Sequence, residues 1–503
     1  MSQRSEHKDK QNKGQFWTPD WIADALVAYV LPKPNTPVEI FDPAVGEGSL
    51  LEAASRRAPG IDLLGCEIDP VPVRTLMEAH VTRGHGGSRL EVKTQDFFDS
   101  PMRARFPAIV ANPPYIRHHR ISATQKAALA EAAQQITGQH IDGRAGLHVH
   151  FLIWCLNQLA PEGRLAFIVP ADICEGVFSR SLWNWIGSTF RIDGVIAFDS
   201  EASPFPDLDT NPIILLIANA TPGVDTVWAQ CDDRICRPPS NHPTSPLATW
   251  VSSGMSLANP PEGVRAISRS VTEMLSTGAS RPPREHVAGR RLGEFIAVQR
   301  GVATGANDFF LFTKERLTRF KIPVEFTVRT VGRTRDVSGD HLTDIDLAKL
   351  DRAGRPTYLL SLPGLSRECL PRSIVSYLEW GEQMGLPERP FLAARSVWYK
   401  SETREPSPPY LFSYLGRRSA RFIRNHAGVT PLSSFLCVYP NPKSELAPSD
   451  LDALLQDPEL TADLAYVGKS YGSGAIKVEP RALESLPVPP VCLDRLQRYR
   501  SVA

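Results

Sequence analysis

The chain of 503 residues lacks long hydrophobic runs and a hydrophobic N-terminus. No apolar run reaches the ~18 residues that a membrane-spanning helix needs, so we expect no membrane partner. Residues 1–13 are polar and charged, which excludes a secretory signal peptide and predicts a mobile N-terminal tail. These features favour a cytoplasmic location.

Paired cysteines and a strong net charge are also missing. The eight cysteines include no C-x-x-C pair, and the closest two are Cys231 and Cys236. This spacing argues against a zinc site and a disulfide framework, so we predict no metal. Net charge is +1, yet residues 281–430 hold 25 Lys plus Arg against 16 Asp plus Glu. An arginine-rich half of this kind can form a strip that faces DNA.

Short apolar strands alternate with helical patterns between residues 36 and 220. Strands are expected at Val38–Phe41, Ile61–Glu67, Leu90–Thr94, Ala108–Ala111, Arg164–Val169, Ile192–Phe198 and Pro212–Ala218. Helices are expected at 48–57, 73–82, Leu147–Leu159 and Ser181–Phe190. This alternation predicts an α/β fold with a mostly parallel sheet covered on both faces.

Residues 237–262 interrupt the pattern with many Pro, Ser and Asn residues, which indicates a linker. We therefore predict a catalytic domain over 14–236. A second domain of mixed α/β or mainly β structure is expected over 263–503.

Three successive strands are expected to end in features that suit a nucleotide-like cofactor. Asp42–Ser49 places two glycines between a strand and a helix, where a ligand can approach the backbone closely. Glu67 ends the next strand and can accept hydrogen bonds from ribose hydroxyls. Asp96 follows the third strand and can accept from an adenine amino group, with Phe97 packing on the ring. We predict S-adenosylmethionine as this cofactor.

The fourth strand leads into Asn112-Pro113-Pro114-Tyr115. Two prolines fix the local backbone and remove two N–H donors. The Asn112 Oδ1 atom and the Pro113 carbonyl can then accept the two N–H groups of a planar amine, which makes its nitrogen nucleophilic toward a cofactor methyl group. Tyr115 offers an aromatic face for the target base. The tetrapeptide predicts methyl transfer to a planar amine.

In the order and spacing of these motifs, the chain resembles the gamma-class, TaqI-like DNA adenine-N6 methyltransferases of restriction–modification systems. The resemblance rests on GQFWTP at 14–19, DPAVGEG, GCEIDP, QDFF, NPPY and GRLAFIVPADI at 163–173. It implies a Rossmann-like methyltransferase domain with a seven-stranded sheet, followed by a target-recognition domain. It also implies that Phe205 stacks on the flipped adenine opposite Tyr115. The implied cofactor-binding residues are Phe16, Thr18, Pro19, Asp42, Ala44, Gly46, Gly48, Glu67, Ile68, Asp96, Phe97, Asn112 and Pro114.

The C-terminal half is similar, less specifically, to target-recognition regions. We expect a monomer with double-stranded DNA as its partner, and a separately encoded cognate restriction endonuclease stays open as a second partner. Arginines are the expected contacts to phosphates and base edges. The predicted DNA-binding residues are Arg117, Arg395, Trp398, Arg417, Arg418 and Arg421.

Other acceptors remain open for the same chemistry. NPPY after a fourth strand also occurs in methyltransferases that act on RNA bases or on a glutamine amide of release factors, which are usually smaller. Transfer to cytosine C5 is disfavoured because no Cys nucleophile follows a proline beyond the fourth strand. A degenerate DNA-binding fold without catalysis is a further alternative, against which the intact Asn112 and Tyr115 argue.

Overall fold

The computed structural model describes residues 17–32, 39–83, 87–99, 105–205, 211–236, 245–282, 289–362, 366–400, 404–413, 420–470 and 476–502. The chain divides into two compact units, and the division falls at residue 283. The first unit holds the elements from α2 to α9, and the second holds most of the elements from residue 289 onward. In the described part, no helix is long and apolar enough to cross a membrane.

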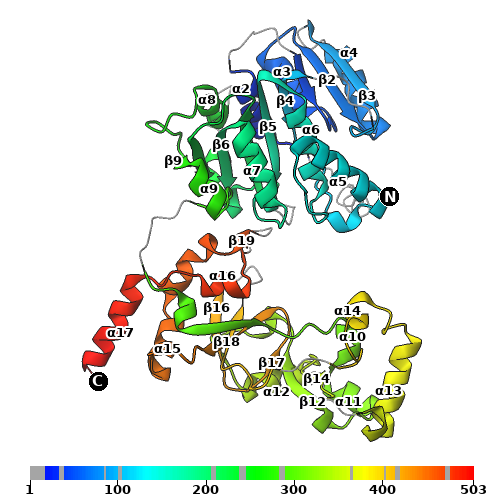
Figure 1. The fold of residues 1–503 in the computed structure, drawn as a ribbon, viewed down its shortest axis with the longest axis vertical. Coiled ribbons are helices and arrows are strands. Elements are labelled where there is room, and N and C mark those ends of the chain that lie inside the picture. The colour runs from blue at the N-terminus through cyan, green and yellow to red at the C-terminus, as the bar shows by residue number, and fades with distance from the viewer. Residues whose placement is uncertain are drawn as a thin grey trace. The chain divides into compact units, whose positions relative to one another are not determined.

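The first unit is built on one nine-stranded sheet (Figure 1). Most neighbouring strands are parallel, and the exceptions are β5–β7, β6–β7 and β8–β9. The sheet order is β3 (Arg89–Thr94), β2 (Asp62–Glu67), β1 (Glu39–Asp42), β4 (Phe106–Ala111), β5 (Leu159–Pro170), β7 (Pro212–Ala218), β6 (Arg191–Phe198), β8 (Asp225–Cys231) and β9 (Val264–Ser270).

Helices cover both faces of this sheet, because successive strand residues point to opposite faces and both sets are apolar. Phe41, Ile109 and Phe167 pack into one core cluster, while Ile40 and Val110 pack into the other. The first cluster is closed by α5 (Ala123–Thr137), α6 (Leu147–Asn157), α7 (Ser179–Thr189) and α9 (Val271–Thr277). The second is closed by α2 (Asp20–Val30), α3 (Ser49–Arg57), α4 (Pro70–Arg83) and α8 (Pro246–Ser252).

The α/β fold predicted between residues 36 and 220 is confirmed. The predicted number of seven strands is wrong. The two extra strands lie at the end of the sheet, where β8 pairs in parallel with β6 and β9 pairs antiparallel with β8. The sequence does not reveal β9, because its residues follow the Pro- and Ser-rich segment and fall in the range predicted for the second domain.

That segment also contains a helix, so the boundaries of the linker and the second domain are displaced. Pro246 stands in the first turn of α8, where proline favours a helix, and Ser245 caps the helix by accepting from the Ala248 N–H. Leu247 and Trp250 are buried against the sheet. Residues 245–270 therefore belong to the first unit, and residues 237–244 lie outside the described residues.

The second unit has mixed α/β structure, as predicted. A five-stranded sheet has the order β10 (Ile296–Arg300), β18 (Phe435–Pro440), β15 (Tyr410–Ser413), β16 (Arg421–Asn425) and β13 (His341–Leu342). A four-stranded sheet has the order β11 (Leu311–Phe312), β14 (Tyr358–Leu360), β12 (Thr327–Val331) and β17 (Thr430–Pro431), and β19 (Lys469–Ser470) pairs with β20 (Ile476–Lys477). The helices are α10 (Asn307–Phe310), α11 (Lys314–Phe320), α12 (Asp344–Arg352), α13 (Arg372–Gln383), α14 (Pro390–Ala393), α15 (Pro448–Leu455), α16 (Pro480–Glu484) and α17 (Pro490–Val502).

Candidate active site

The predicted cofactor and catalytic residues meet at one edge of the first unit's sheet. Strands β3, β2, β1 and β4 are consecutive neighbours and all run parallel, so their carboxyl ends lie side by side. Asp42 and Glu67 end β1 and β2, Asp96 follows β3 and Asn112 follows β4. This edge is where open α/β sheets bind their ligands.

The loop after β1 is held to the end of β2 by backbone and carboxylate contacts. Glu67 accepts from the Gly46 N–H through Oε2 at 2.9 Å and from the Asp69 N–H through Oε1 at 3.0 Å. Gly48 has φ +89°, and a Cβ on it would lie 2.4 Å from Leu76 Cδ1. Only glycine therefore fits at this position, and Glu67 sets the shape of the cofactor loop.

Asp42 lies beneath this loop and is 1% exposed. Its Oδ1 atom accepts from the Ala44 N–H at 2.9 Å, whereas Oδ2 is buried with no hydrogen-bond partner among the described residues. Burial raises the pKa of Asp42 to about 7, and the negative charge of Glu67 adds to the rise. An unsatisfied buried oxygen beside a glycine loop fits a cofactor that brings a hydrogen-bond donor.

The raised pKa of Asp42 predicts a pH-dependent stability of the cofactor-free protein. A carboxyl whose native pKa lies above its unfolded value contributes stability that is complete below about pH 4 and is lost as the pH rises toward 7. Relative to the Asp42→Asn variant, which does not titrate there, the wild-type melting temperature is expected to fall from about pH 5 to about pH 8. A temperature difference that stays constant over this range would contradict the burial argument.

Three other predicted cofactor contacts differ in how far they are exposed. Asp96 is half-buried, and its Oδ1 atom accepts from the Phe98 N–H at 3.0 Å. Ile68 is 66% exposed next to Glu67. The ring of Phe97, by contrast, is 2% exposed and packs against Phe41 and Phe151 in the core. The core thus encloses most of this ring, and its packing on an adenine stays a prediction.

The segment before α2 reaches the catalytic tetrapeptide. Thr18 is 6% exposed, and its Oγ1 atom accepts from Asn112 Nδ2 at 3.2 Å. This bond orients the amide, with Nδ2 toward Thr18 and Oδ1 away from it. Pro19 directly precedes α2, and Phe16 lies outside the described residues. Thr18, predicted as a cofactor contact, is thus also a positioning residue for Asn112.

Replacing Thr18 by valine keeps the shape of the side chain but removes the acceptor for Asn112. Loss of one hydrogen bond is expected to lower kcat for methyl transfer by about 2- to 10-fold. The Thr18→Ser variant keeps the hydroxyl and is expected to stay near the wild-type rate. Steady-state kinetics with labelled cofactor measure both, and equal rates for Thr18→Val and wild type would refute the contact's role.

Tyr115 and Phe205 lie together, as the predicted pair around a flipped base requires. Their ring centroids are 6.2 Å apart with an interplanar angle of 81°, and Phe205 is 6% exposed. The rings meet edge to face, so a base cannot lie flat against both until one ring turns. Tyr115 donates its hydroxyl to the Ile168 carbonyl at 3.2 Å, and burial raises the pKa of Tyr115 so that this donor stays protonated. Pro113 is buried and Pro114 is half-buried beside them.

Sequence reasoning missed a polar cluster behind this tyrosine. His148 and His150 on α6 are 3% and 5% exposed, and burial lowers the pKa of His150 to about 4. His148 Nε2 lies 3.1 Å from Asp172 Oδ1. The available signal was the pair of histidines in LHVHFLIW, an otherwise apolar helix.

The predicted DNA-binding residues divide into three groups. Arg117 is exposed and follows the tetrapeptide by two residues. Arg395 donates to the Ala303 carbonyl at 2.8 Å and the Thr304 carbonyl at 3.0 Å, and Trp398 packs on Phe309. Arg421 donates to two backbone carbonyls of residues 337–339, so these arginines also stabilise the fold. Arg417 and Arg418 lie outside the described residues.

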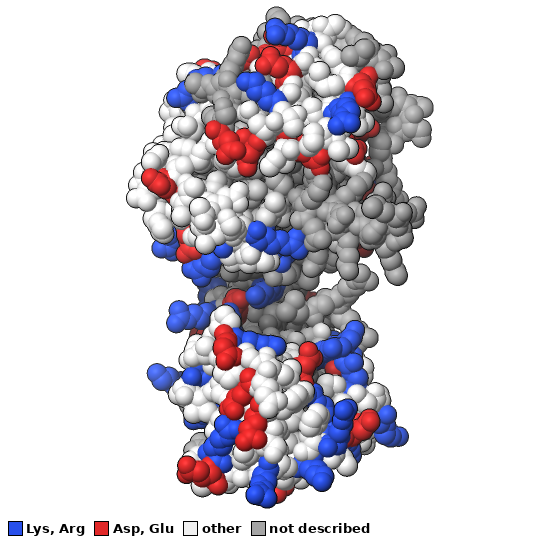
Figure 2. Space-filling view, turned by 90° about the vertical axis from the view of Figure 1, so that its right-hand side faces the viewer, with Lys and Arg blue, Asp and Glu red and all other residues white. Residues whose placement is uncertain are grey.

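The arginine-rich composition of the second unit is partly offset by ion pairs. Acidic and basic side chains are interspersed over the face of this unit seen in Figure 2. The guanidinium groups of Arg329, Arg355 and Arg367 lie within ion-pair distance of carboxylates. Where the chain is described, no three His, Cys, Asp or Glu residues gather in a way that could hold a metal ion.

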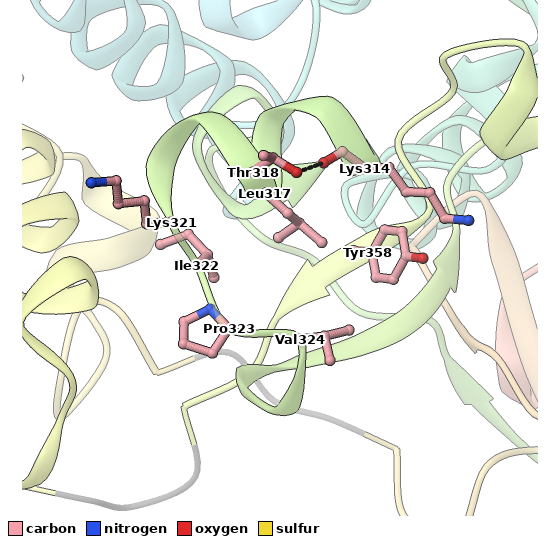
Figure 3. Close-up of a pocket in the computed structure, with 8 residues that line it drawn as sticks. All are labelled: Lys314, Leu317, Thr318, Lys321, Ile322, Pro323, Val324 and Tyr358. Carbon is pink, nitrogen blue, oxygen red and sulfur yellow. Dashed lines mark hydrogen bonds between the residues drawn. The ribbon is translucent and has the colours of Figure 1, made fainter.

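A shallow pocket of about 430 Å³ lies on the second unit between α11, β14 and the turn that follows α11 (Figure 3). Its lysines extend away from an apolar centre, and Lys314 Nζ lies 3.4 Å from Asp351 Oδ2, which offsets its charge. The lining residues are Lys314, Leu317, Thr318, Lys321, Ile322, Pro323, Val324 and Tyr358. The pocket contains none of the strand-end residues.

Comparisons with known proteins cover both units. The N-6 DNA Methylase family model matches residues 2–182, and the model of the C-terminal domain of the Type II methyltransferase M.Eco57I matches residues 281–501. The Type II methyltransferases M.AccI of Acinetobacter calcoaceticus and M.XamI of Xanthomonas campestris pv. amaranthicola are each 25% identical to this chain. Each match covers 95% of this chain and 85% of the relative.

Among solved structures, the Type IIL restriction-modification enzyme MmeI in complex with DNA is similar in fold. The TM-score is 0.53 at 12% identity, and the match covers 96% of this chain and 65% of that one. This chain thus spans slightly less than two thirds of that structure. The glycine loop, the strand-end acids and the tetrapeptide occur together in a chain matched by both family models. These matches support a gamma-class N6-adenine DNA methyltransferase.

Proposed function

We propose that this protein transfers the methyl group of S-adenosylmethionine to N6 of a flipped adenine at specific sites in duplex DNA. The observation that carries the proposal is Asn112 at the end of β4, with its amide oriented by Thr18 and the glycine loop on the neighbouring strand β1. The family matches support the adenine amine in DNA as the acceptor.

The chain's own groups activate the amine by geometry and electrostatics. The lone pair of an exocyclic amine is delocalised into its ring, and acceptance of its two N–H groups by Asn112 Oδ1 and the Pro113 carbonyl draws it toward a nucleophilic form. Such preorganised acceptors are effective because they need no rearrangement during the reaction. S-adenosylmethionine, when bound, supplies an electrophilic methyl group for this nitrogen.

The cofactor would be held by the residues at the ends of β1, β2 and β3. Asp42 Oδ2 provides a buried acceptor, and Glu67 is the acceptor for ribose hydroxyls. Asp96 would accept from the adenine amino group of the cofactor. The remaining proposed cofactor contacts are Phe16, Thr18, Pro19, Ala44, Gly46, Gly48, Ile68, Phe97, Asn112 and Pro114.

Flipping the target base out of the duplex costs a few kcal/mol. Stacking of the base on an aromatic ring stabilises the flipped state by about 1–3 kcal/mol per base. Tyr115 and Phe205 are the proposed stacking residues, and the turn of one ring from the edge-to-face arrangement would open the place for the base. Arg117 is the proposed DNA contact nearest to the tetrapeptide. Arg395, Trp398, Arg417, Arg418 and Arg421 remain proposed contacts of the second unit.

Other acceptors, RNA or a protein glutamine, are not favoured. The relatives that match 95% of the chain are Type II methyltransferases, and that match includes the second unit. We further propose that the protein acts as a monomer in the cytoplasm and protects DNA from a separately encoded cognate endonuclease. Analytical ultracentrifugation and cleavage assays on modified DNA test these expectations.

Incubation of the protein with S-adenosylmethionine and plasmid DNA, followed by single-molecule sequencing, tests the proposal. N6-methyladenine is expected within one recurrent sequence, on one or both strands. The same reaction on total RNA is the comparison. Methyl groups found only on RNA, or scattered over DNA without a common sequence, would overturn the assignment of a site-specific DNA substrate.

A further inference from the structure

A buried histidine lies behind the tyrosine of the catalytic tetrapeptide. His148, in the first turn of α6, has its ring centroid 6.4 Å from that of Tyr115, at an interplanar angle of 73°. Its Nε2 atom lies 3.1 Å from Asp172 Oδ1, which belongs to the short helix Ala171–Cys174 after β5. The two atoms are close enough for an ion pair when the ring is protonated. Their geometry does not meet the angle that a hydrogen bond requires.

Backbone contacts join the same three segments. The Leu147 N–H donates to the Ile116 carbonyl at 2.9 Å, which ties the start of α6 to the residue after Tyr115. The Tyr115 hydroxyl donates to the Ile168 carbonyl on β5. Tyr115 is thus held by β5 at its hydroxyl and contacted by α6 at its ring.

Gly146 permits this close approach. A Cβ on Gly146 would lie 2.6 Å from His148 Cε1 and 3.0 Å from the Ile116 carbonyl oxygen. The histidine ring therefore folds back over the residue that joins α6 to the loop after Tyr115. Any larger residue at position 146 would push the ring or this loop away.

Packing alone does not account for a histidine at this position. Burying a polar ring nitrogen without a hydrogen bond costs free energy, and His148 Nδ1 has no such partner in the described part of the chain. An apolar ring of similar size would fill the space without that cost. The Asp172 carboxylate, whose side chain is 58% exposed, is the polar group that the histidine reaches.

We propose that His148, linked to Asp172, is a positioning residue that sets the orientation of the Tyr115 ring for the flipped base. The inference rests on the proposed function, because it assigns His148 a part in the same methyl transfer. His148 acts through Tyr115, and no proton transfer to the substrate is involved. Its loss lowers kcat, while the affinity for cofactor and the overall fold stay as they are.

Steady-state kinetics on a duplex that carries the mapped methylation site test this role. His148→Phe keeps an aromatic edge against Tyr115 but removes the link to Asp172, and Asp172→Asn removes the charge from the other side. Each variant is expected to lower kcat by roughly 10- to 100-fold, as misplacement of a positioned group does, with KM for DNA and cofactor within about twofold. His140→Phe, at an exposed histidine after α5, is the matched control and should retain the wild-type kcat.

The double variant His148→Phe with Asp172→Asn separates the link from independent damage. If both residues act through one contact, its kcat is expected to lie within about twofold of the slower single variant. A kcat loss equal to the product of the single losses would overturn the link. So would an unchanged kcat in His148→Phe, or a loss matched by a lower melting temperature. These outcomes test the role of His148 only if the wild-type protein methylates DNA. A wild-type protein without activity would instead refute the proposed function.

Discussion

Replacement of Asn112 by alanine is expected to lower kcat for N6-adenine methylation by about 10²- to 10³-fold, the effect of removing one preorganised polar group from a reaction centre. The variant loses Oδ1, which is the proposed acceptor of an amine N–H, and the amide that Thr18 orients. The melting temperature is expected to change little, because Asn112 is only half-buried. The measurement is single-turnover methylation of DNA with labelled cofactor.

Asn157→Ala is the matched control for this variant. Asn157 is exposed at the C-terminal end of α6 in the same unit, so its loss should leave the rate at the wild-type level. Cofactor binding to Asn112→Ala, measured by calorimetry, should remain within about threefold of wild type, because most of the proposed cofactor contacts lie at the ends of β1 to β3. An Asn112→Ala protein that methylates at the wild-type rate would remove the tetrapeptide from the mechanism.

The Glu67→Gln variant is expected to bind S-adenosylmethionine about 10- to 100-fold more weakly, because hydrogen bonds to a charged group contribute about 1.5–3 kcal/mol. The carboxylate accepts from the N–H groups of Gly46 and Asp69 with its two oxygens. A glutamine amide can accept with only one atom, and its NH₂ group would face an N–H donor. The cofactor loop thus loses one contact, and the ribose loses one acceptor.

Calorimetric titration with the cofactor measures this effect, and Glu131→Gln provides the control. Glu131 is exposed on α5, so its replacement should leave the dissociation constant unchanged. The expected pattern is a higher dissociation constant in Glu67→Gln with a smaller change in kcat at saturating cofactor. Equal affinities for wild type and Glu67→Gln would contradict the placement of the cofactor at the end of β2.

The strand ends of the first unit could be predicted because local sequence determines them. Each strand is a short apolar run that ends in a polar residue, and parallel strands bring such ends to one edge. The sequence therefore places Asp42, Glu67, Asp96 and Asn112 together at one edge of the sheet. Glycines at 46 and 48 marked the loop, because both residues have a positive φ and Gly48 also lies close to Leu76.

Side-chain contacts between distant segments could not be predicted in this way. The ring of Phe97 faces Phe41 and Phe151, which lie far from it in sequence, and the pattern QDFF does not reveal which aromatic ring enters the core. Arg395 and Arg421 were predicted as DNA contacts. In the structure they donate to the carbonyls of Ala303 and Val337, which lie 92 and 84 residues away in the sequence. The Pro-, Ser- and Asn-rich composition of 237–262 indicated a linker, although Pro246 stands in the first turn of α8, where proline favours a helix.

In the proposed mechanism, the tetrapeptide directs the methyl group to adenine N6 in DNA. The most direct test uses S-adenosylmethionine with a deuterated methyl group, plasmid DNA and mass spectrometry of the nucleosides after digestion. With the wild-type protein we expect the labelled methyl group on N6 of deoxyadenosine, and with Asn112→Ala we expect that signal to be lost. The label on a cytosine, or an equal adenine signal from both proteins, would contradict the proposed mechanism.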